Sequence, residues 1–128
     1  MKFRYTILYV HDVGEAVAFY ERACGLRRRF VHEGGQYTEM DTGATVLAFV
    51  SVELARSNLP DGFRENDPGE PPPGVEIAFT TQDVQAAFRV AVEAGATKVA
   101  EPAVKPWGQT VAYVRDRDGI LVEIASEK

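Results

Sequence analysis

The sequence has little of what several protein classes require. It contains one cysteine, Cys24, so it cannot form a disulfide framework. No apolar stretch approaches the roughly 18 to 20 residues that a membrane helix needs. The net charge of -5 argues against nucleic-acid binding, which usually requires a basic face. The N-terminus enters a strand pattern directly, without the shape of a signal peptide, so we expect a cytoplasmic protein with no membrane or nucleic-acid partner.

The second half of the chain repeats the first. A helical spacing of apolar residues runs over 12–25 and again over 83–95, each time opened by Asp-Val and ended by glycine. A glycine then starts a final apolar strand in each half, over 43–51 and over 119–126. Because 45% of the 128 residues are hydrophobic, the chain can bury a sizeable core. The repeat suggests two modules joined around a pocket.

Both modules have the pattern β-α-β-β-β, which predicts an α+β fold. The expected strands cover 3–10, 26–33, 36–42 and 45–52 in the first half, and 75–81, 97–101, 109–115 and 120–126 in the second. Asp12 and Asp83 can cap the two helices, and Gly34-Gly35 indicates a hairpin turn. The first module covers about 1–52 and the second about 74–128.

The segment 53–73 interrupts this pattern. It is charged and contains Pro60-Asp61-Gly62, Asp67-Pro68-Gly69 and Pro71-Pro72-Pro73. We interpret it as a linker between the modules or as a mobile flap over the pocket, since long loops often serve as lids.

Two glutamates stand on the predicted strands at matching places in the fold. In the last strand, Ile120, Val122 and Ile124 share one face, and Glu123 lies on the other. In strand 75–81, Glu76 likewise alternates with apolar residues. An ionised carboxylate on a buried strand needs a partner, a metal or solvent, so we expect both glutamates to meet on one concave, polar surface. The alternative is that both face solvent from the wet side of a sheet.

Other reactive or charged residues have simpler interpretations. Cys24 ends the first helix pattern, where a small buried residue is expected. The run Arg27-Arg28-Arg29 is typical of a solvated strand edge. His11 and His32 lie beside turns, and we expect them to be exposed or capping residues.

A set of short motifs covers nearly the whole chain. These motifs are Asp12-Val13, Phe19-Tyr20 and Gly25-Leu26, then Asp83-Val84, Ala94-Gly95-Ala96, Pro106-Trp107-Gly108 and Asp116-Arg117-Asp118-Gly119 before Val122-Glu123-Ile124. On them the chain resembles the vicinal oxygen chelate superfamily, which includes glyoxalase I, bleomycin-resistance and fosfomycin-resistance proteins and extradiol dioxygenases. The resemblance implies paired βαβββ modules that form a curved mixed sheet around a cavity, and a homodimer.

The resemblance also implies four metal-ligand positions, on the first and last strand of each module. They fall on Tyr5, Ala48, Glu76 and Glu123. Alanine cannot bind a metal, and a phenol is a poor ligand because it keeps its proton at neutral pH. Two carboxylates alone would make a weak, oxygen-only site. We therefore expect a degenerate metal site with no cofactor, or at most weak binding of a divalent ion.

Two functional hypotheses follow. The first is a metal-free small-molecule binding protein of the bleomycin-resistance type, serving ligand sequestration or resistance. Its pocket residues would be Tyr5, Glu76, Trp107, Tyr113 and Glu123, although Trp107 equally suits a core position. The acidic pocket favours a cationic or polyhydroxylated ligand.

The second hypothesis is a lyase or isomerase, with or without a divalent metal. Glu123 would be its catalytic base and Tyr5 a donor to a developing oxyanion, since two close carboxylates can supply one acid and one base. A non-catalytic partner domain ranks last, because no docking motif is evident.

Overall fold

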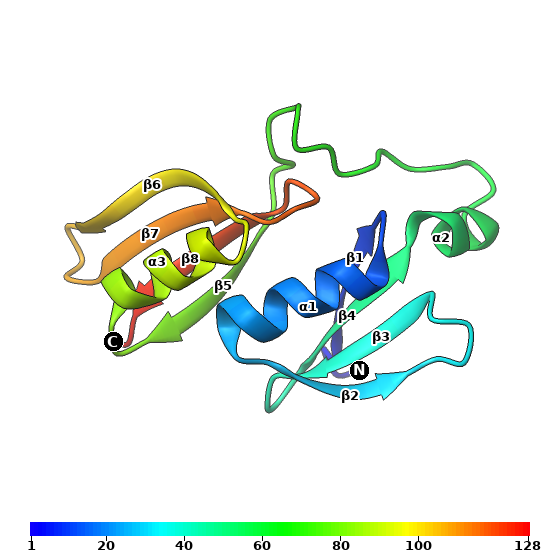
Figure 1. Ribbon diagram of the computed structural model, residues 1–128, viewed down its shortest axis with the longest axis horizontal. Coiled ribbons are helices and arrows are strands. Elements are labelled where there is room, and N and C mark those ends of the chain that lie inside the picture. The colour runs from blue at the N-terminus through cyan, green and yellow to red at the C-terminus, as the bar shows by residue number, and fades with distance from the viewer. The chain divides into compact units, whose positions relative to one another are not determined.

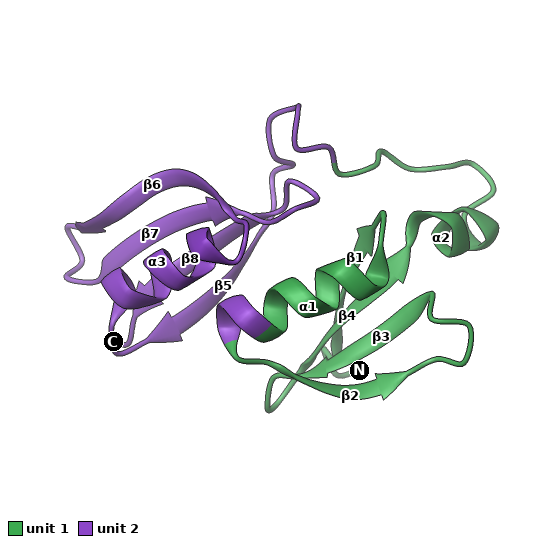
Figure 2. Ribbon diagram, in the orientation of Figure 1, with its two compact units in different colours: residues 1–21, 25–66 green, residues 22–24, 67–128 purple.

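The computed structural model describes residues 1–128 and divides the chain into two compact units (Figure 2). Unit 1 comprises residues 1–21 and 25–66, and unit 2 comprises residues 22–24 and 67–128.

Unit 1 contains a four-stranded sheet with one parallel pair. Its elements are β1 (Tyr5–Val10), α1 (Val13–Cys24), β2 (Arg27–Val31), β3 (Tyr37–Asp41), β4 (Val46–Ser51) and α2 (Val52–Asn58) (Figure 1). The strand order is β1-β4-β3-β2. The first and last strands run parallel, whereas β4–β3 and β3–β2 are antiparallel.

Unit 2 repeats this topology. Its elements are β5 (Glu76–Thr81), α3 (Val84–Glu93), β6 (Thr97–Val104), β7 (Thr110–Arg115) and β8 (Leu121–Ser126). The strand order is β5-β8-β7-β6, with β5 parallel to β8 and the other pairs antiparallel. The predicted α+β fold of two βαβββ modules is therefore confirmed.

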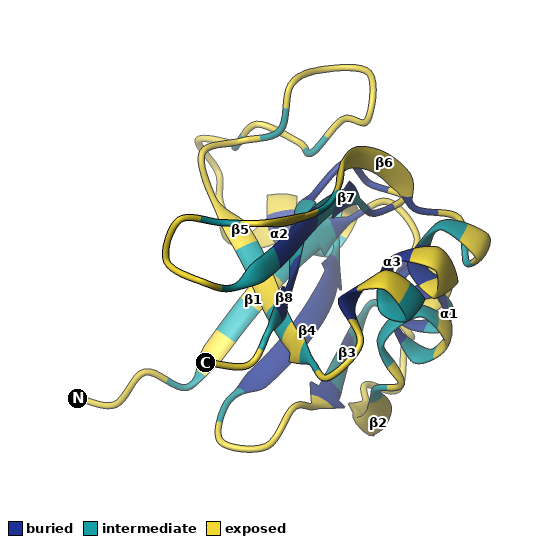
Figure 3. Ribbon diagram, turned by 90° about the vertical axis from the view of Figure 1, so that its left-hand side faces the viewer, coloured by how far each residue is buried: buried dark blue, intermediate teal, exposed yellow.

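The central strands and the helix faces form the core of each unit. In unit 1, Tyr20 of α1 stacks on Phe49 of β4 with ring centroids 5.1 Å apart, and both side chains are fully buried. In unit 2, Phe88 of α3 is buried together with Val122 and Ile124 of β8. Figure 3 shows β4 buried along its length, whereas β2 is exposed. The arginine run of β2 thus lies on a solvated edge strand, as predicted.

The two predicted helices, α1 and α3, begin and end where the sequence indicated. The Asp12 side chain accepts a hydrogen bond from the Glu15 amide at 2.9 Å, and the Asp83 side chain accepts one from the Ala86 amide at 2.9 Å. These bonds satisfy amides that have no partner inside the helix. Gly25 ends α1 with a left-handed φ of 67°, a conformation that glycine adopts without steric cost.

Two predicted elements need correction. The start of segment 53–73 is helical, because Ser51 caps α2 through the Leu54 amide at 3.1 Å and the residues that follow are good helix formers. Strand β6 extends to Val104 rather than ending at 101. Proline at position 102 is tolerated there because β6 is an edge strand with register shifts.

The rest of segment 53–73 makes contacts within each unit. In unit 1, the Phe63 ring lies edge-on to Tyr9 at 4.8 Å, and the Asn66 amide donates to the Tyr9 carbonyl at 3.2 Å. In unit 2, Arg115 donates to the carbonyls of Asp67 at 3.1 Å and Pro68 at 3.3 Å.

A membrane cannot be crossed by any helix of this structure, since none combines the necessary length with the necessary apolarity.

Candidate functional site

The strand pairing places the four family positions at equivalent points in the two units. In the β1–β4 ladder, the partner of Tyr5 lies two residues before Ala48. In the β5–β8 ladder, the partner of Glu76 lies two residues before Glu123. The structural repeat therefore has the same register as the sequence repeat.

Glu76 and Glu123 meet on the face of the unit 2 sheet that lies opposite α3. Glu76 is exposed, and Glu123 is half-buried on the central strand β8. A hydrogen bond between the two side chains, then partial burial and the charge of Glu123, raise the pKa of Glu76 from 4.5 to about 7. Because Glu76 is exposed, we attribute the shift mainly to its neighbour. The pair therefore holds one shared proton below pH 7 and releases it as the pH rises through 7.

Tyr113 supplies a further hydrogen bond to this pair. It lies directly opposite Glu123 in the β7–β8 ladder, and its hydroxyl donates to Glu123 Oε2 at 3.1 Å. Partial burial and the bond to Glu123 raise the pKa of Tyr113, so its proton stays in place as a donor. Below pH 7, the three side chains form a polar cluster with one carboxylic acid, one carboxylate and one phenol.

The turn before β8 is closed by hydrogen bonds to Asp116. The buried side chain of Asp116 accepts hydrogen bonds from the amides of Asp118 and Ile120, each at 2.9 Å. The Asp116 amide donates to the Ile120 carbonyl at 2.9 Å. The motif Asp116-Arg117-Asp118-Gly119 is therefore a hydrogen-bonded turn that leads into β8.

Unit 1 has a different cluster on the corresponding face, which sequence reasoning missed. Glu39 of β3 lies directly opposite Ala48. Its Oε2 accepts from the Tyr37 hydroxyl at 2.9 Å, and its Oε1 accepts from Arg29 Nε at 3.2 Å. The alternation of polar and apolar residues along the strand could have indicated Glu39. It is followed by Met40, which is buried, just as Glu123 alternates with apolar residues.

The two remaining predicted pocket residues are exposed. Tyr5 has 45% of its surface accessible, and the Arg4 guanidinium lies 5.9 Å from its ring centroid. Trp107 is 62% exposed in the turn between β6 and β7, and its Nε1 donates to Gln109 Oε1 at 2.9 Å. The alternative of a core position for Trp107 is therefore wrong, because most of the residue is accessible to solvent.

The two histidines are exposed, and the cysteine stays protonated. His11 is exposed with Nδ1 3.7 Å from Glu65, and His32 is exposed with Nδ1 accepting from the Gly34 amide at 3.4 Å. Burial raises the pKa of Cys24 to about 12, which keeps it a thiol. A thiol is a weak nucleophile, as expected for a packing residue.

The residues at the four family positions do not fit a metal centre. Ala48 has no donor atom, and Tyr5 offers only a phenol. Glu76 and Glu123 share a proton, which a metal would have to displace. No three His, Cys, Asp or Glu side chains anywhere in the chain are grouped so that they could hold a metal ion.

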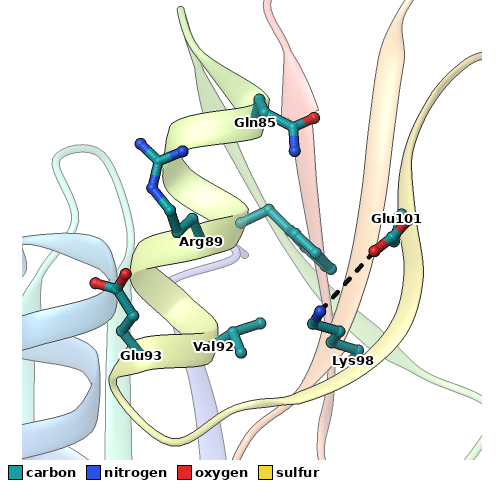
Figure 4. Close-up of a pocket in the computed structure, with 7 residues that line it drawn as sticks. Gln85, Arg89, Val92, Glu93, Lys98 and Glu101 are labelled. Carbon is teal, nitrogen blue, oxygen red and sulfur yellow. Dashed lines mark ion pairs between the residues drawn. The ribbon is translucent and has the colours of Figure 1, made fainter.

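A separate hollow of about 350 Å³ lies between α3 and β6 (Figure 4). Phe88 and Val92 form its apolar wall, and Lys98 and Glu101 form an ion pair at 3.9 Å on the β6 side. None of the predicted site residues lines it, so it is distinct from the carboxylate cluster.

Comparisons with known proteins agree with this fold. The family model of the Glyoxalase/Bleomycin resistance protein/Dioxygenase superfamily matches residues 2–124. The chain is similar to a glyoxalase-related enzyme from Fulvimarina pelagi, with a TM-score of 0.84, 19% identity and coverage of 99% of this chain and 88% of that one. It is also similar to a glyoxalase/bleomycin resistance protein/dioxygenase family enzyme from Burkholderia phytofirmans PsJN, with a TM-score of 0.81, 18% identity and coverage of 98% of each chain. No curated protein matches the sequence.

Proposed function

The chain belongs to the Glyoxalase/Bleomycin resistance protein/Dioxygenase superfamily, and from this premise we propose that it is a small-molecule binding protein whose recognition site is the Glu76–Glu123 pair. The observation that carries the proposal is the hydrogen bond from the Tyr113 hydroxyl to Glu123 Oε2 at 3.1 Å, beside Glu76, whose pKa the Glu123 carboxyl raises. Such a cluster offers acceptors for ligand donors while one carboxylate remains ionised.

The chemistry of the cluster selects the ligand class. A cationic group would bind the ionised carboxylate and gain further when Glu76 loses its shared proton. Hydroxyl groups of a polyol would exchange hydrogen bonds with the same oxygens. An anionic group would meet like charge, so unit 2 should discriminate against phosphates and carboxylates at this cluster. Sequestration of a cationic or polyhydroxylated compound is the role that these properties support, and binding of this kind needs no metal.

A ligand screen with matched variants tests this proposal. A panel of amines, guanidines and polyols is titrated against the wild type, Glu123→Gln and Glu70→Gln, with binding followed by NMR and calorimetry. Glu70 is exposed in the segment before β5, does not line the hollow of Figure 4, and serves as the control. We expect cationic ligands to lose at least about tenfold in affinity in Glu123→Gln, since a hydrogen bond to a charged group contributes ~1.5–3 kcal/mol. The proposal would be contradicted if no compound of the panel bound, or if the two variants bound cationic ligands with equal affinity.

A lyase or isomerase is the second candidate, favoured by the raised pKa of Glu76. A pair that holds one proton near neutral pH can remove a proton through one carboxyl group and return one through the other. Exchange of solvent deuterium into small α-hydroxy carbonyl compounds would reveal this activity. Glu123→Gln should abolish the exchange without unfolding the chain, and exchange that persists in the variant would exclude this role of Glu123. Homodimerisation and a cytoplasmic location stay predictions.

A further inference from the structure

An irregularity in β2 directs one arginine away from the helix-covered face. Arg28 pairs with Met40, and Phe30 pairs with Glu39, so Arg29 is the extra residue between two ladder positions. A bulge of this kind changes the direction of a side chain. Arg29 therefore reaches Glu39, on the face opposite the buried Met40.

The neighbouring arginines differ in how many of their donors are used. Arg28 donates to Glu21 of α1 through both Nε and Nη2, at 3.1 and 3.2 Å. Arg29 donates to Glu39 through Nε alone, at 3.2 Å, and its Nη nitrogens have no protein partner. A guanidinium has five N–H donors in a planar fork. Arg29 thus keeps the outer end of that fork available, with nearly half of its side chain exposed.

Glu39 is built to orient this arginine rather than to bind a ligand itself. Its side chain is only 13% exposed, and each carboxylate oxygen already accepts a hydrogen bond, one from Arg29 and one from Tyr37. Burial and the bond to Glu39 raise the pKa of Tyr37 to about 12, so Tyr37 remains a donor. Two donors on one carboxylate fix the position of the guanidinium.

An exposed aromatic residue pairs with Glu39, the residue that holds the guanidinium. Phe30 is 49% exposed and lies opposite Glu39 in the β2–β3 ladder. Its ring centroid lies 6.5 Å from that of Tyr37, at an interplanar angle of 57°. An exposed ring next to an oriented cation provides a surface on which the apolar body of a ligand can stack.

We propose that Arg29 and Phe30 form a binding site in unit 1 for a small aromatic carboxylate. The carboxylate accepts two parallel hydrogen bonds from the Arg29 fork, and the aromatic ring packs on Phe30. A monoanionic carboxylate suits this site better than a dianionic phosphate, because the charge of Glu39 repels the second negative charge. The inference does not depend on the proposed function of Glu76 and Glu123, whose cluster favours cations.

Titration of phenylacetate into the full chain, followed by NMR, tests this site. Phenylacetamide and phenyl phosphate are the comparison probes. We expect phenylacetate to shift the resonances of β2 and β3 and to bind more tightly than either. Absence of phenylacetate binding, or equal affinity for phenylacetamide, would overturn the proposal.

Three variants distinguish the contribution of the planar Arg29 guanidinium from that of its positive charge. Arg29→Gln should weaken phenylacetate binding at least tenfold, and Arg29→Lys should weaken it less, because lysine keeps the charge but lacks the fork. Arg28→Gln is the matched control and should bind as the wild type does. An Arg29→Gln variant that binds as tightly as the wild type, or a loss as large in Arg28→Gln, would overturn the assignment.

Discussion

Glu39 and Ala48 face each other across the β3–β4 ladder, so unit 1 carries a carboxylate on the strand next to the one where unit 2 carries Glu123. In unit 2 the position of Glu39 is taken by Tyr113. Each unit therefore combines a tyrosine and a glutamate on this face. In unit 1 both Glu39 oxygens are occupied by protein donors, and in unit 2 the carboxylate is paired with a second glutamate.

The Glu76–Glu123 pair should make the stability of the fold depend on pH. Glu76 binds its proton more tightly in the folded state, with a pKa of about 7 against 4.5. Its stabilising contribution is therefore complete below pH 4.5 and is lost as the pH rises through 7. We expect the melting temperature to fall between pH 5 and 8, and to fall less in Glu123→Gln. An identical pH profile in the two proteins, measured by calorimetry, would argue against the shared proton.

Removal of the Tyr113 hydroxyl should strengthen proton binding by the pair. A donor that bonds to a carboxylate stabilises its ionised form, so Tyr113→Phe should move the titration of the pair above pH 7. The same change should cost about 1 kcal/mol in the free energy of unfolding. Tyr9→Phe is the control, because the Tyr9 hydroxyl has no protein partner. An unchanged titration in Tyr113→Phe would contradict the hydrogen bond.

Gly119 should tolerate no side chain. Its φ is 89°, and an added Cβ would lie 2.8 Å from the Pro68 backbone and 2.7 Å from Arg115 Nη2. We expect Gly119→Ala to lower the free energy of unfolding by about 1–3 kcal/mol, the usual cost of such backbone strain. Gly34→Ala is the control, since no atom lies within 4 Å of its added Cβ and its φ is not positive. Urea denaturation that affects both variants equally would refute this role of Gly119.

Metal addition should leave the protein unchanged. Because Ala48 lacks a donor and the two glutamates share a proton, we expect elemental analysis of protein purified without chelator or nickel resin to find no stoichiometric metal. Added Mn, Fe, Co, Ni or Zn should not raise the melting temperature. About one bound transition ion per chain would revive metal-assisted chemistry and contradict our interpretation of the site.

The periodicity and the internal repeat of the sequence predict the strands, the faces of their side chains and the equivalence of the two modules. Alternation along 75–81 and 120–126 places Glu76 and Glu123 on the same face, and the repeat aligns them. The sequence does not predict the Arg29 contact with Glu39, because a bulge shifts the register by one residue and only the strand pairing reveals it. It also misses α2, since the prolines and glycines after residue 59 outweigh a short helical stretch.

The central claim is that Glu76 and Glu123 share a proton that titrates near pH 7. A ¹³C NMR titration of the glutamate side-chain carboxyl groups in the full chain tests it most directly. We predict one carboxyl resonance with a midpoint near pH 7, which moves to the ordinary glutamate range in Glu123→Gln and stays near pH 7 in Glu93→Gln. If every glutamate of the wild type titrates in the ordinary range near pH 4 to 5, the pair is not coupled and the proposed recognition site is wrong.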